Sequence, residues 1–280
     1  MTKVAAVVLS WNGREDTLAC LRSLEREDVD VIVVDNASTD GSAEAVTGVG
    51  LIRNDENLGY AGGMNVGIRA ALERGADAVL LLNNDVEVEP GAVAALAEAA
   101  TGAGAVCPLV VFADDPGRVW YAGADFDPRH GYQGRHRTAV EGDETERICG
   151  AAVLIPRETI ERIGAFDEAL FAYVEDADWS LRAREAGLAL RVVPGARVRH
   201  RVSASTGGEG SPDALYYSVR NLLTVCERHA PLGRLGTWRR RLTALAAFTA
   251  QALMARRRRA RLRAVRAGWR DFRRGRYGPR

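Results

Sequence analysis

The chain has 280 residues, of which 47% are hydrophobic and 27% charged, an ordinary composition for a soluble globular protein. This length suits one large α/β domain with an appendage, or two small domains. The four cysteines lie far apart without a C-x-x-C pair, which argues against a zinc site and a disulfide framework and favours a reducing cytosol. The apolar run after Lys3 is too short for a signal peptide.

The net charge of +1 conceals an asymmetry. Residues 233–280 contain 16 arginines and one acidic residue, Asp271, whereas the other 232 residues contain 22 basic and 36 acidic residues. A basic tail on an acidic body indicates a partner that carries phosphate groups, on nucleic acid or on anionic lipid.

Buried strands alternate with helices along the first 101 residues, an order that predicts a doubly wound, mostly parallel α/β sheet. A polar excursion over the site is expected at 114–146, and a Ser/Thr/Gly-rich loop at 202–211. Strands are predicted at 2–10, 29–35, 49–53, 78–82, 105–112, 147–156 and 188–193, with a short extended segment at 197–200. Helices are predicted at 14–25, 64–74, 91–101 and 157–163, from 175 to 187 and from about 212, with a short one after 42.

Polar side chains close several of these strands. The apolar run Ala78–Leu82 ends in Asn83-Asn84-Asp85, and the two earlier strands end in Ser10-Trp11-Asn12 and Asp35-Asn36. Each ending by itself fits a turn, since Asn and Asp favour turns. On a parallel sheet, however, the carboxyl ends of the strands meet at one crevice, where ligands bind.

The chemistry of these ends favours a nucleotide and a metal ion. No G-x-G-x-x-G follows the first strand and no G-x-x-x-x-G-K-[ST] occurs, so the usual dinucleotide and P-loop phosphate cradles are missing. Asp35 can accept hydrogen bonds from a base or a ribose. Asp85 can bind a divalent cation that bridges a diphosphate.

Several segments together resemble the family 2 glycosyltransferases of the GT-A fold, in particular their bacterial rhamnosyltransferase-like members. They occur in family order across about the first 230 residues. The matching segments are VVLSWNG (7–13), VIVVDNASTDGS (31–42), NLGYAGGMNVG (57–67), LLLNNDVEVEPG (80–91), the long segment 150–187 that contains YVEDADWS, VRHRVSAS (198–205) and YYSVRN (216–221).

This resemblance implies a donor site and a metal site. Asn83-Asn84-Asp85 occupies the position of the family's DxD motif, with Asn83 in place of the first Asp, so Asp85 is the expected ligand of Mn²⁺ or Mg²⁺. His200 matches the family's late His, a second metal or diphosphate ligand, although a lone His is more often structural. The implied donor-binding residues are Leu9, Ser10, Trp11, Asn12, Asp35, Asn36, Asn57, Gly59, Gly62, Gly63, Asn65, Asn83, Asn84, Arg220 and Asn221.

The resemblance also implies an inverting mechanism with a carboxylate base. An inverting transfer needs a group that takes the proton from the acceptor hydroxyl, and the motif gives that role to Asp176. Glu175 and Asp178 are then support or acceptor-contact residues, and Trp179 shapes the acceptor pocket or packs in the core. The alternative is that these acidic residues simply favour a helix N-terminus. His130, His136 and His229 receive no role.

The basic tail is predicted to lie on a membrane surface. Its apolar segment 242–254 is shorter than the roughly 20 residues that span a bilayer, and arginines and aromatic residues flank it. This pattern is typical of an interfacial helix on anionic lipid. A nucleic-acid tail is disfavoured because nothing else suggests base readout, and a helix covering the acidic body is the third interpretation. We expect a cytoplasmic protein, peripheral at the membrane, with residues 1–230 as the catalytic domain.

Two other functions compete with this prediction. A sugar-phosphate nucleotidyltransferase usually carries a G-x-G-T-R-like loop, which SWNGRE is not. A catalytically silent nucleotide-sugar-binding module is expected to lose its acidic residues, yet Asp35, Asp85 and Asp176 are present. The donor is expected to be a dTDP- or UDP-linked sugar such as dTDP-L-rhamnose. The acceptor is expected to be a glycolipid, a polysaccharide or a natural product.

Overall fold

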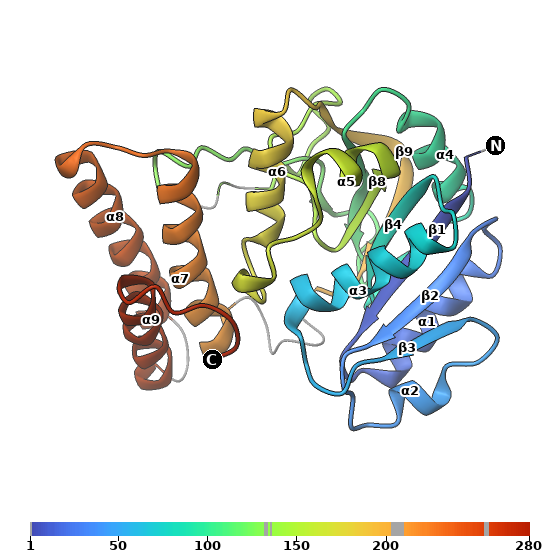
Figure 1. Ribbon diagram of the computed structural model, residues 1–280, viewed down its shortest axis with the longest axis horizontal. Coiled ribbons are helices and arrows are strands. Elements are labelled where there is room, and N and C mark those ends of the chain that lie inside the picture. Colours follow the sequence, from blue (N-terminus) through green and yellow to red (C-terminus); the bar gives the residue numbers. More distant parts are fainter. Residues whose placement is uncertain (1, 132–133, 135, 203–209, 255–257) are drawn as a thin grey trace.

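The predicted α/β sheet is confirmed. The computed structural model describes residues 2–131, 134, 136–202, 210–254 and 258–280, and within them one nine-stranded sheet forms the centre of the larger part of the molecule (Figure 1). Four strands pair in parallel in the order β3-β2-β1-β4. These are β1 (Val4–Ser10), β2 (Asp30–Asp35), β3 (Gly50–Arg53) and β4 (Ala78–Asn83).

The other half of the sheet brings a late segment of the chain beside the end of β4. β8 (Ala152–Pro156) runs antiparallel between β4 and β6 (Ala105–Phe112), and β9 (Leu190–His200) runs parallel to β6. The two extended segments predicted at 188–193 and 197–200 are one strand, β9, with a register shift where Pro108 pairs with Val193 and Leu109 with Arg197. Two short strands complete the sheet: β5 (Val86–Val88) on β9 and β7 (Val119–Tyr121) on β6.

Helix α3 (Gly59–Glu73) begins five residues before its predicted start at residue 64. Its early turns are rich in glycine because the helix lies very close to β1. A Cβ on Gly67 would lie 2.1 Å from Val7 Cγ1, and one on Gly63 would lie 2.4 Å from Leu9 Cδ1. The other helices of this part are α1 (Arg14–Leu24), α2 (Ser42–Ala45), α4 (Ala92–Ala99), α5 (Arg157–Ile163) and α6 (Glu175–Glu185), with a 3-10 turn, η1 (Glu168–Leu170).

Three helices form a second unit at the other end of the molecule (Figure 1). They are α7 (Pro212–His229), α8 (Arg234–Leu253) and α9 (Arg258–Arg273). Their buried apolar side chains form one cluster that also includes Ala177 and Leu181 of α6. The tail therefore packs on α7, a helix that lies before the domain boundary predicted at residue 230. The division of the chain into two domains at that residue stays a prediction.

The predicted interfacial segment 242–254 is helical, as part of α8. Of the helices in the described ranges, none combines the length and the hydropathy needed to cross a bilayer. Most of the loop predicted at 202–211, with the end of the VRHRVSAS segment, falls outside the described residues.

Candidate active site

The polar strand ends meet at one edge of the sheet, as the sequence predicts. Ser10 pairs with Asp35 across β1 and β2, and Leu9 pairs with Asn83 across β1 and β4. This register places the ends of three neighbouring strands side by side.

Asp35 offers a free acceptor at this edge. Its Oδ2 accepts a hydrogen bond from the backbone N–H of Ser38 at 3.1 Å. Its Oδ1 is buried and, among the described residues, accepts no hydrogen bond. A buried carboxylate oxygen without a partner is costly unless a ligand supplies one, so this atom is suited to a ribose hydroxyl or a base N–H.

Asn36 and Asn57 shape the loop that follows β3. The Asn36 amide donates to Asn57 Oδ1 at 3.0 Å and to the Gly59 carbonyl at 2.9 Å. Its oxygen accepts from Asn54 Nδ2 and from the Leu58 N–H. These contacts use the amide within the protein, which supports a role in holding the loop rather than the donor contact implied by the resemblance.

Hydrogen bonds within the protein also hold the residues at the end of β1 and just after it. Asn84 Nδ2 donates to the Asn12 carbonyl and to Thr17 Oγ1, both at 3.0 Å. The hydroxyl of Ser10 also contacts Thr17 Oγ1, at 3.0 Å, and Asn12 Oδ1 accepts from the Thr39 N–H. Trp11 in contrast is 42% exposed, so its indole is open to a ligand.

Asp85 and His200 lie together at the end of β4. Nε2 of His200 is 3.2 Å from Oδ1 of Asp85, and both side chains are almost completely buried. Among the described residues, neither Asp85 Oδ1 nor His200 Nδ1 has a hydrogen-bond partner. Asp85 lies in the turn between β4 and β5, far in sequence from His200 at the end of β9, and the pairing of Val86 with His200 brings the two residues together.

Trp120 packs against His200 and also against His136, a histidine for which the sequence predicts no role. The Trp120 ring lies edge-on to both His200 and His136, with centroids 4.7 and 4.6 Å apart. Burial, reinforced by the charges of Arg147 and His200, lowers the pKa of His136 to about 4. His136 is therefore neutral at physiological pH. His136 lies alone in a polar segment, and no pattern in the sequence predicts that its ring packs against Trp120.

Glu175 and Asp176 begin α6 and differ in environment. Burial, together with the charge of the neighbouring Asp176, raises the pKa of Glu175 to about 8. Asp176 is more exposed, its Oδ1 accepts from the Ala177 N–H, and its Oδ2 lies 3.9 Å from Arg147 Nε. Arg147 is a second residue of this site that the sequence patterns do not predict. Asp176 is thus the acidic side chain of this pair that remains accessible.

Asp178 and Trp179, the next two candidates, have their polar atoms engaged within the protein. Asp178 is fully buried and accepts from Arg182 Nε at 3.0 Å and Arg228 Nη1 at 2.8 Å, with His229 Nε2 at 3.0 Å. The Trp179 ring is also fully buried, and its Nε1 donates to the Gly164 carbonyl. These contacts support packing and ion pairing between helices rather than the predicted contact with an acceptor.

The glycines and the asparagine of α3 serve close packing. Gly59 has a φ of +73°, and a Cβ there would lie 2.3 Å from the Phe171 carbonyl oxygen; at Gly62 it would lie 2.8 Å from Leu58 Cβ. Asn65 donates to the Phe166 carbonyl at 2.9 Å and accepts from the Phe166 N–H. Asn65 therefore anchors the segment before α6 and has no free amide for the donor sugar.

Arg220 and Asn221 are completely buried in α7. Asn221 Nδ2 donates to the carbonyls of Leu170, Ala172 and Tyr173 at 2.7–2.8 Å. Arg220 donates to Asn221 Oδ1 and to the Leu170 carbonyl, both at 2.9 Å. Their polar atoms hold backbone rather than face a diphosphate, which is a different placement from the one implied by the resemblance.

A metal ion would have two protein ligands of the predicted kinds here, Asp85 and His200. Within the described ranges, no group of three or more His, Cys, Asp or Glu side chains is arranged to hold a metal. The pair fits a cation that takes its remaining ligands from water and from a bound diphosphate, because Mg²⁺ and Mn²⁺ sites commonly combine one or two protein carboxylates with phosphate oxygens.

Comparison with known proteins identifies the family. A family model described as glycosyl transferase family 2 matches residues 6–164. The chain is 29% identical over 259 residues to N-acetylglucosaminyl-diphospho-decaprenol L-rhamnosyltransferase of Mycobacterium tuberculosis, with 80% of this chain and 82% of that protein covered. It is 26% identical over 245 residues to the dTDP-rhamnosyl transferase RfbF of Shigella flexneri, with 82% of each covered.

A solved structure supports the fold. The crystal structure of GalNAc-T7 with UDP, GalNAc and Mn²⁺ superposes with a TM-score of 0.63 at 18% identity, over 79% of this chain and 48% of that one. The likeness confirms the GT-A fold that the sequence predicts.

Proposed function

The chain belongs to glycosyl transferase family 2 and is a glycosyltransferase, and from that premise we propose that it transfers L-rhamnose or a related deoxysugar from a nucleotide diphosphate. Two relatives are named rhamnosyltransferases, and the name of one specifies dTDP. The name of the other specifies a diphospho-decaprenol-linked acceptor. We propose a lipid-linked glycan as the acceptor, with a polysaccharide or natural product as alternatives.

The observation that carries the proposal is the pair Asp85–His200 beside Asp35 at one edge of the sheet. Each of the three presents a buried polar atom for which the described residues supply no hydrogen bond. Asp85 and His200 would hold Mn²⁺ or Mg²⁺, and Asp35 would hold the nucleoside. When bound, the cation would neutralise the negative charge that develops on the departing diphosphate.

In the proposed mechanism, Asp176 is the general base. Its carboxylate takes the proton of the acceptor hydroxyl while the hydroxyl oxygen forms a bond to the anomeric carbon. The bond from that carbon to the diphosphate oxygen breaks on the opposite face, and its electron pair leaves with the nucleotide diphosphate. The configuration at the anomeric carbon is thereby inverted.

Glu175 is poorly suited to the same role at neutral pH. Its raised pKa, caused first by burial, keeps it protonated below about pH 8. A protonated neighbour adds no second negative charge beside Asp176, and the Arg147 guanidinium 3.9 Å from Asp176 Oδ2 supplies a positive one. The two acidic residues therefore have separate roles, with Asp176 as base and Glu175 as a neutral support.

Calorimetric titration with dTDP, UDP and GDP, each with and without Mn²⁺, tests the proposal. We expect one nucleotide to bind, and to bind more tightly with the metal. Asp85→Ala should remove the metal-dependent part, whereas Asp114→Asn, which neutralises an exposed acidic residue, should leave it unchanged. Failure of all three nucleotides to bind would contradict the donor site, and equal binding by Asp85→Ala would contradict the metal site.

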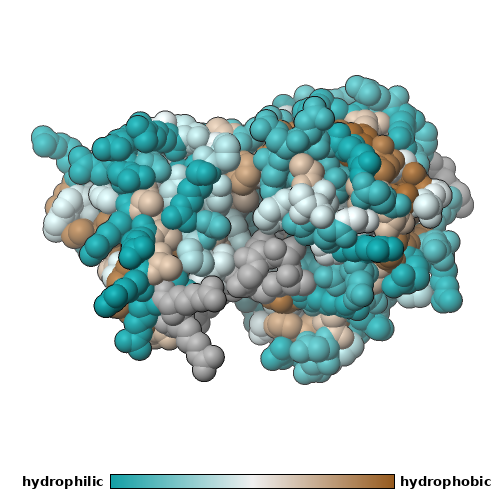
Figure 2. All heavy atoms as spheres, turned by 90° about the horizontal axis from the view of Figure 1, so that it is seen from below, coloured by the Kyte–Doolittle hydropathy of each residue, from teal (hydrophilic) through white to brown (hydrophobic). Residues whose placement is uncertain are grey.

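We also propose that α8 and α9 bind the surface of an anionic membrane, which would bring the enzyme to a lipid-linked acceptor. Leu235, Trp238, Leu242 and Leu253 of α8 are 46–70% exposed and lie on one side of the helix, opposite the buried Ala244 and Phe248. Hydrophilic side chains gather around this end of the molecule (Figure 2). Five exposed arginines lie along one face of α9: Arg259, Arg263, Arg266, Arg270 and Arg273.

A further inference from the structure

The segment that leads into α6 has an unusual backbone. Phe171, Tyr173 and Val174 have φ values of 66°, 66° and 73°, a region that non-glycine residues seldom adopt and that is most unfavourable for a β-branched residue such as Val. Such a conformation is strained and persists only where the surrounding structure holds it. The candidate base Asp176 follows two residues later.

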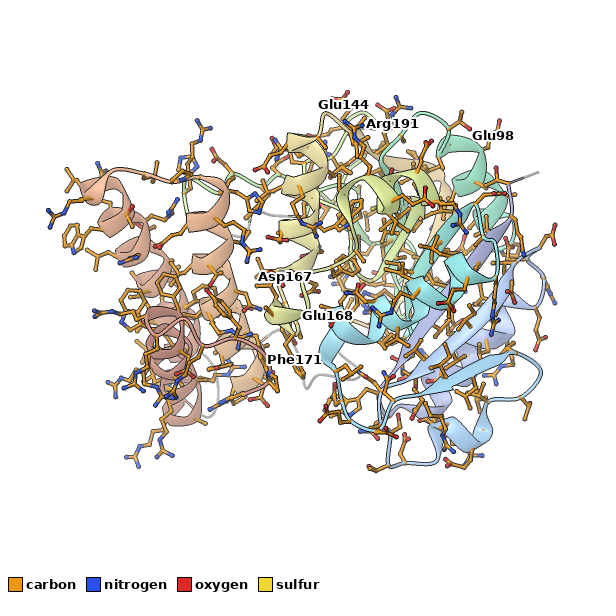
Figure 3. The ribbon with its side chains drawn as sticks, viewed as in Figure 1. Glu98, Glu144, Asp167, Glu168, Phe171 and Arg191 are labelled. Carbon is orange, nitrogen blue, oxygen red and sulfur yellow. The ribbon has the colours of Figure 1, made fainter. Side chains whose placement is uncertain are left out.

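The buried side chains of α7 supply part of that support. The side-chain nitrogen of Asn221 donates hydrogen bonds to three backbone carbonyls of this segment, and Arg220 donates one to the Leu170 carbonyl. Figure 3 shows Asp167, Glu168 and Phe171 on the segment between α7 and the sheet. The base helix is therefore tied to the second helical unit immediately before it begins.

A third piece of chain, Tyr277–Arg280, completes this arrangement. Arg220 Nη1 donates to the Gly278 carbonyl at 2.6 Å, and the Gly278 N–H donates to the Ala169 carbonyl at 2.9 Å. The Arg280 N–H donates to the Tyr217 hydroxyl at 2.9 Å. The Tyr217 ring in turn stacks on Phe171 with centroids 5.2 Å apart.

The same segment also contacts the glycine-rich start of α3. The Phe171 carbonyl accepts from the Ala61 N–H at 3.0 Å, and Gly59 lies so close to that carbonyl that a side chain has no room. The segment is thus held between the predicted donor-side helix and residues that come more than 100 positions later.

We propose that Tyr277–Arg280 is a positioning element of the active site. Through Arg220 and Tyr217 it fixes segment 168–174, and through that segment it fixes the start of α6 and the carboxylate of Asp176. The tail is then required for the chemical step as well as for attachment to a surface. The inference rests on the proposed function only for the role of Asp176.

Gly278→Pro is the sharpest test. Proline has no N–H to donate to Ala169 and its φ near −65° is incompatible with the φ of +81° at Gly278. The matched control is Gly142→Pro, at another glycine with positive φ (+82°) that has no neighbour within 4 Å of an added Cβ. Deletion of Tyr277–Arg280 is the second variant and removes no buried side chain.

Two readouts separate this inference from the proposed function. By hydrogen exchange with mass spectrometry, without substrate, Gly278→Pro and the deletion should exchange peptide 168–178 at least about 10-fold faster, since the segment opens more often. With dTDP-L-rhamnose and water as the acceptor, kcat should fall about 10- to 100-fold because a small misplacement of a catalytic group is costly. KM for the donor should change less than about twofold, because Asp35, Asp85 and His200, which are proposed to hold the donor and its cation, lie on other elements.

Exchange equal to that of Gly142→Pro in both variants would overturn the inference. So would faster exchange with an unchanged kcat, because the base would then not depend on the segment. If the unmodified protein does not turn over dTDP-L-rhamnose, the proposal that this sugar nucleotide is the donor is contradicted. The exchange result still decides whether Tyr277–Arg280 holds the segment.

Discussion

Three acidic residues in one helical turn have three different environments. Asp176 is partly accessible beside Arg147, Glu175 is buried with a raised pKa, and Asp178 is buried in a group of cationic partners. All three are acidic residues that the sequence allows at a helix N-terminus. Only the direction of each side chain, set by the helical rotation of about 100° per residue, separates a candidate base from a structural ion pair.

Asp176→Asn tests the base directly. Loss of a general base costs about 10²- to 10⁴-fold in rate, so we expect turnover to fall by at least about 100-fold while the nucleotide affinity measured by calorimetry is retained. The control is Asp178→Asn, which should lower the melting temperature because it removes the partner of Arg228 and His229. Unchanged turnover in Asp176→Asn would remove this residue as the base.

The stability of the protein should fall as the pH rises above neutral. Burial alone lowers the pKa of His229, but its hydrogen bonds to Asp178 and Glu185 outweigh burial and raise it above 6.5. Burial raises the pKa of Glu175 to about 8. Both groups bind a proton more strongly in the folded state, so the stabilisation from each is complete below its unfolded pKa and is lost as the pH passes its folded pKa.

The measurement is the melting temperature between pH 7 and pH 8, because His136, whose pKa is lowered to about 4, contributes a rise in stability mainly at lower pH. It should decline across this range in the unmodified protein, and the decline should be smaller in His229→Gln and in Glu175→Gln, which cannot titrate. A melting temperature that rises with pH, or the same decline in both variants, would contradict this assignment.

Among the elements, the sheet was the most predictable part, because its buried strands are continuous apolar runs and their polar ends share a register. The internal hydrogen bonds of Asn36, Asn65, Arg220 and Asn221 were not predictable. Their partners are backbone carbonyls and amides of distant loops, and a sequence pattern shows the residue type without its partner. The merging of two extended segments into β9 was also missed, because Pro194 and Gly195 interrupt the strand pattern.

Helix α3 offers a test of the close packing between helix and sheet. Gly67→Ala puts a methyl group 2.1 Å from Val7 Cγ1 and 3.1 Å from Val34 Cγ2, two stiff side chains in buried strands. We expect the free energy of unfolding to fall by about 1–3 kcal/mol, as for other overpacked cores, although Ala favours a helix by about 1 kcal/mol over Gly.

Denaturant unfolding measures this change. Gly195→Ala is the control because an added Cβ there has no neighbour within 4 Å, and its effect should stay within about 0.5 kcal/mol. A Gly67→Ala protein as stable as the unmodified one would show that α3 can move away from β1 without cost.

At the scale of the whole molecule, the acidic body and the basic tail are two units of opposite charge that pack together. Arg263 and Arg266 lie on the exposed face of α9, and among the described residues no carboxylate forms an ion pair with either. Each arginine near an anionic bilayer contributes about 1 kcal/mol of binding free energy.

Replacing Arg263 and Arg266 with Gln should therefore weaken binding to phosphatidylglycerol-containing vesicles by about 10- to 30-fold. Sedimentation with vesicles measures the partition coefficient, and pure phosphatidylcholine vesicles should bind neither protein well. The matched control is the exchange of the exposed, ion-paired Arg53 and Arg129 for Gln in the body. Equal loss in both double variants would mean that the tail is not the lipid-binding face.

The hydrogen bond between Gly278 and Ala169 also implies an order of events during synthesis. Segment 168–174 leaves the ribosome more than 100 residues before the chain that holds it, and domains form progressively from the N-terminal side. The sheet and the predicted donor site can therefore be complete while the start of α6 still samples other conformations. The start of α6 would reach its final position only after the contact between Gly278 and Ala169 has formed, which is later than the formation of the sheet.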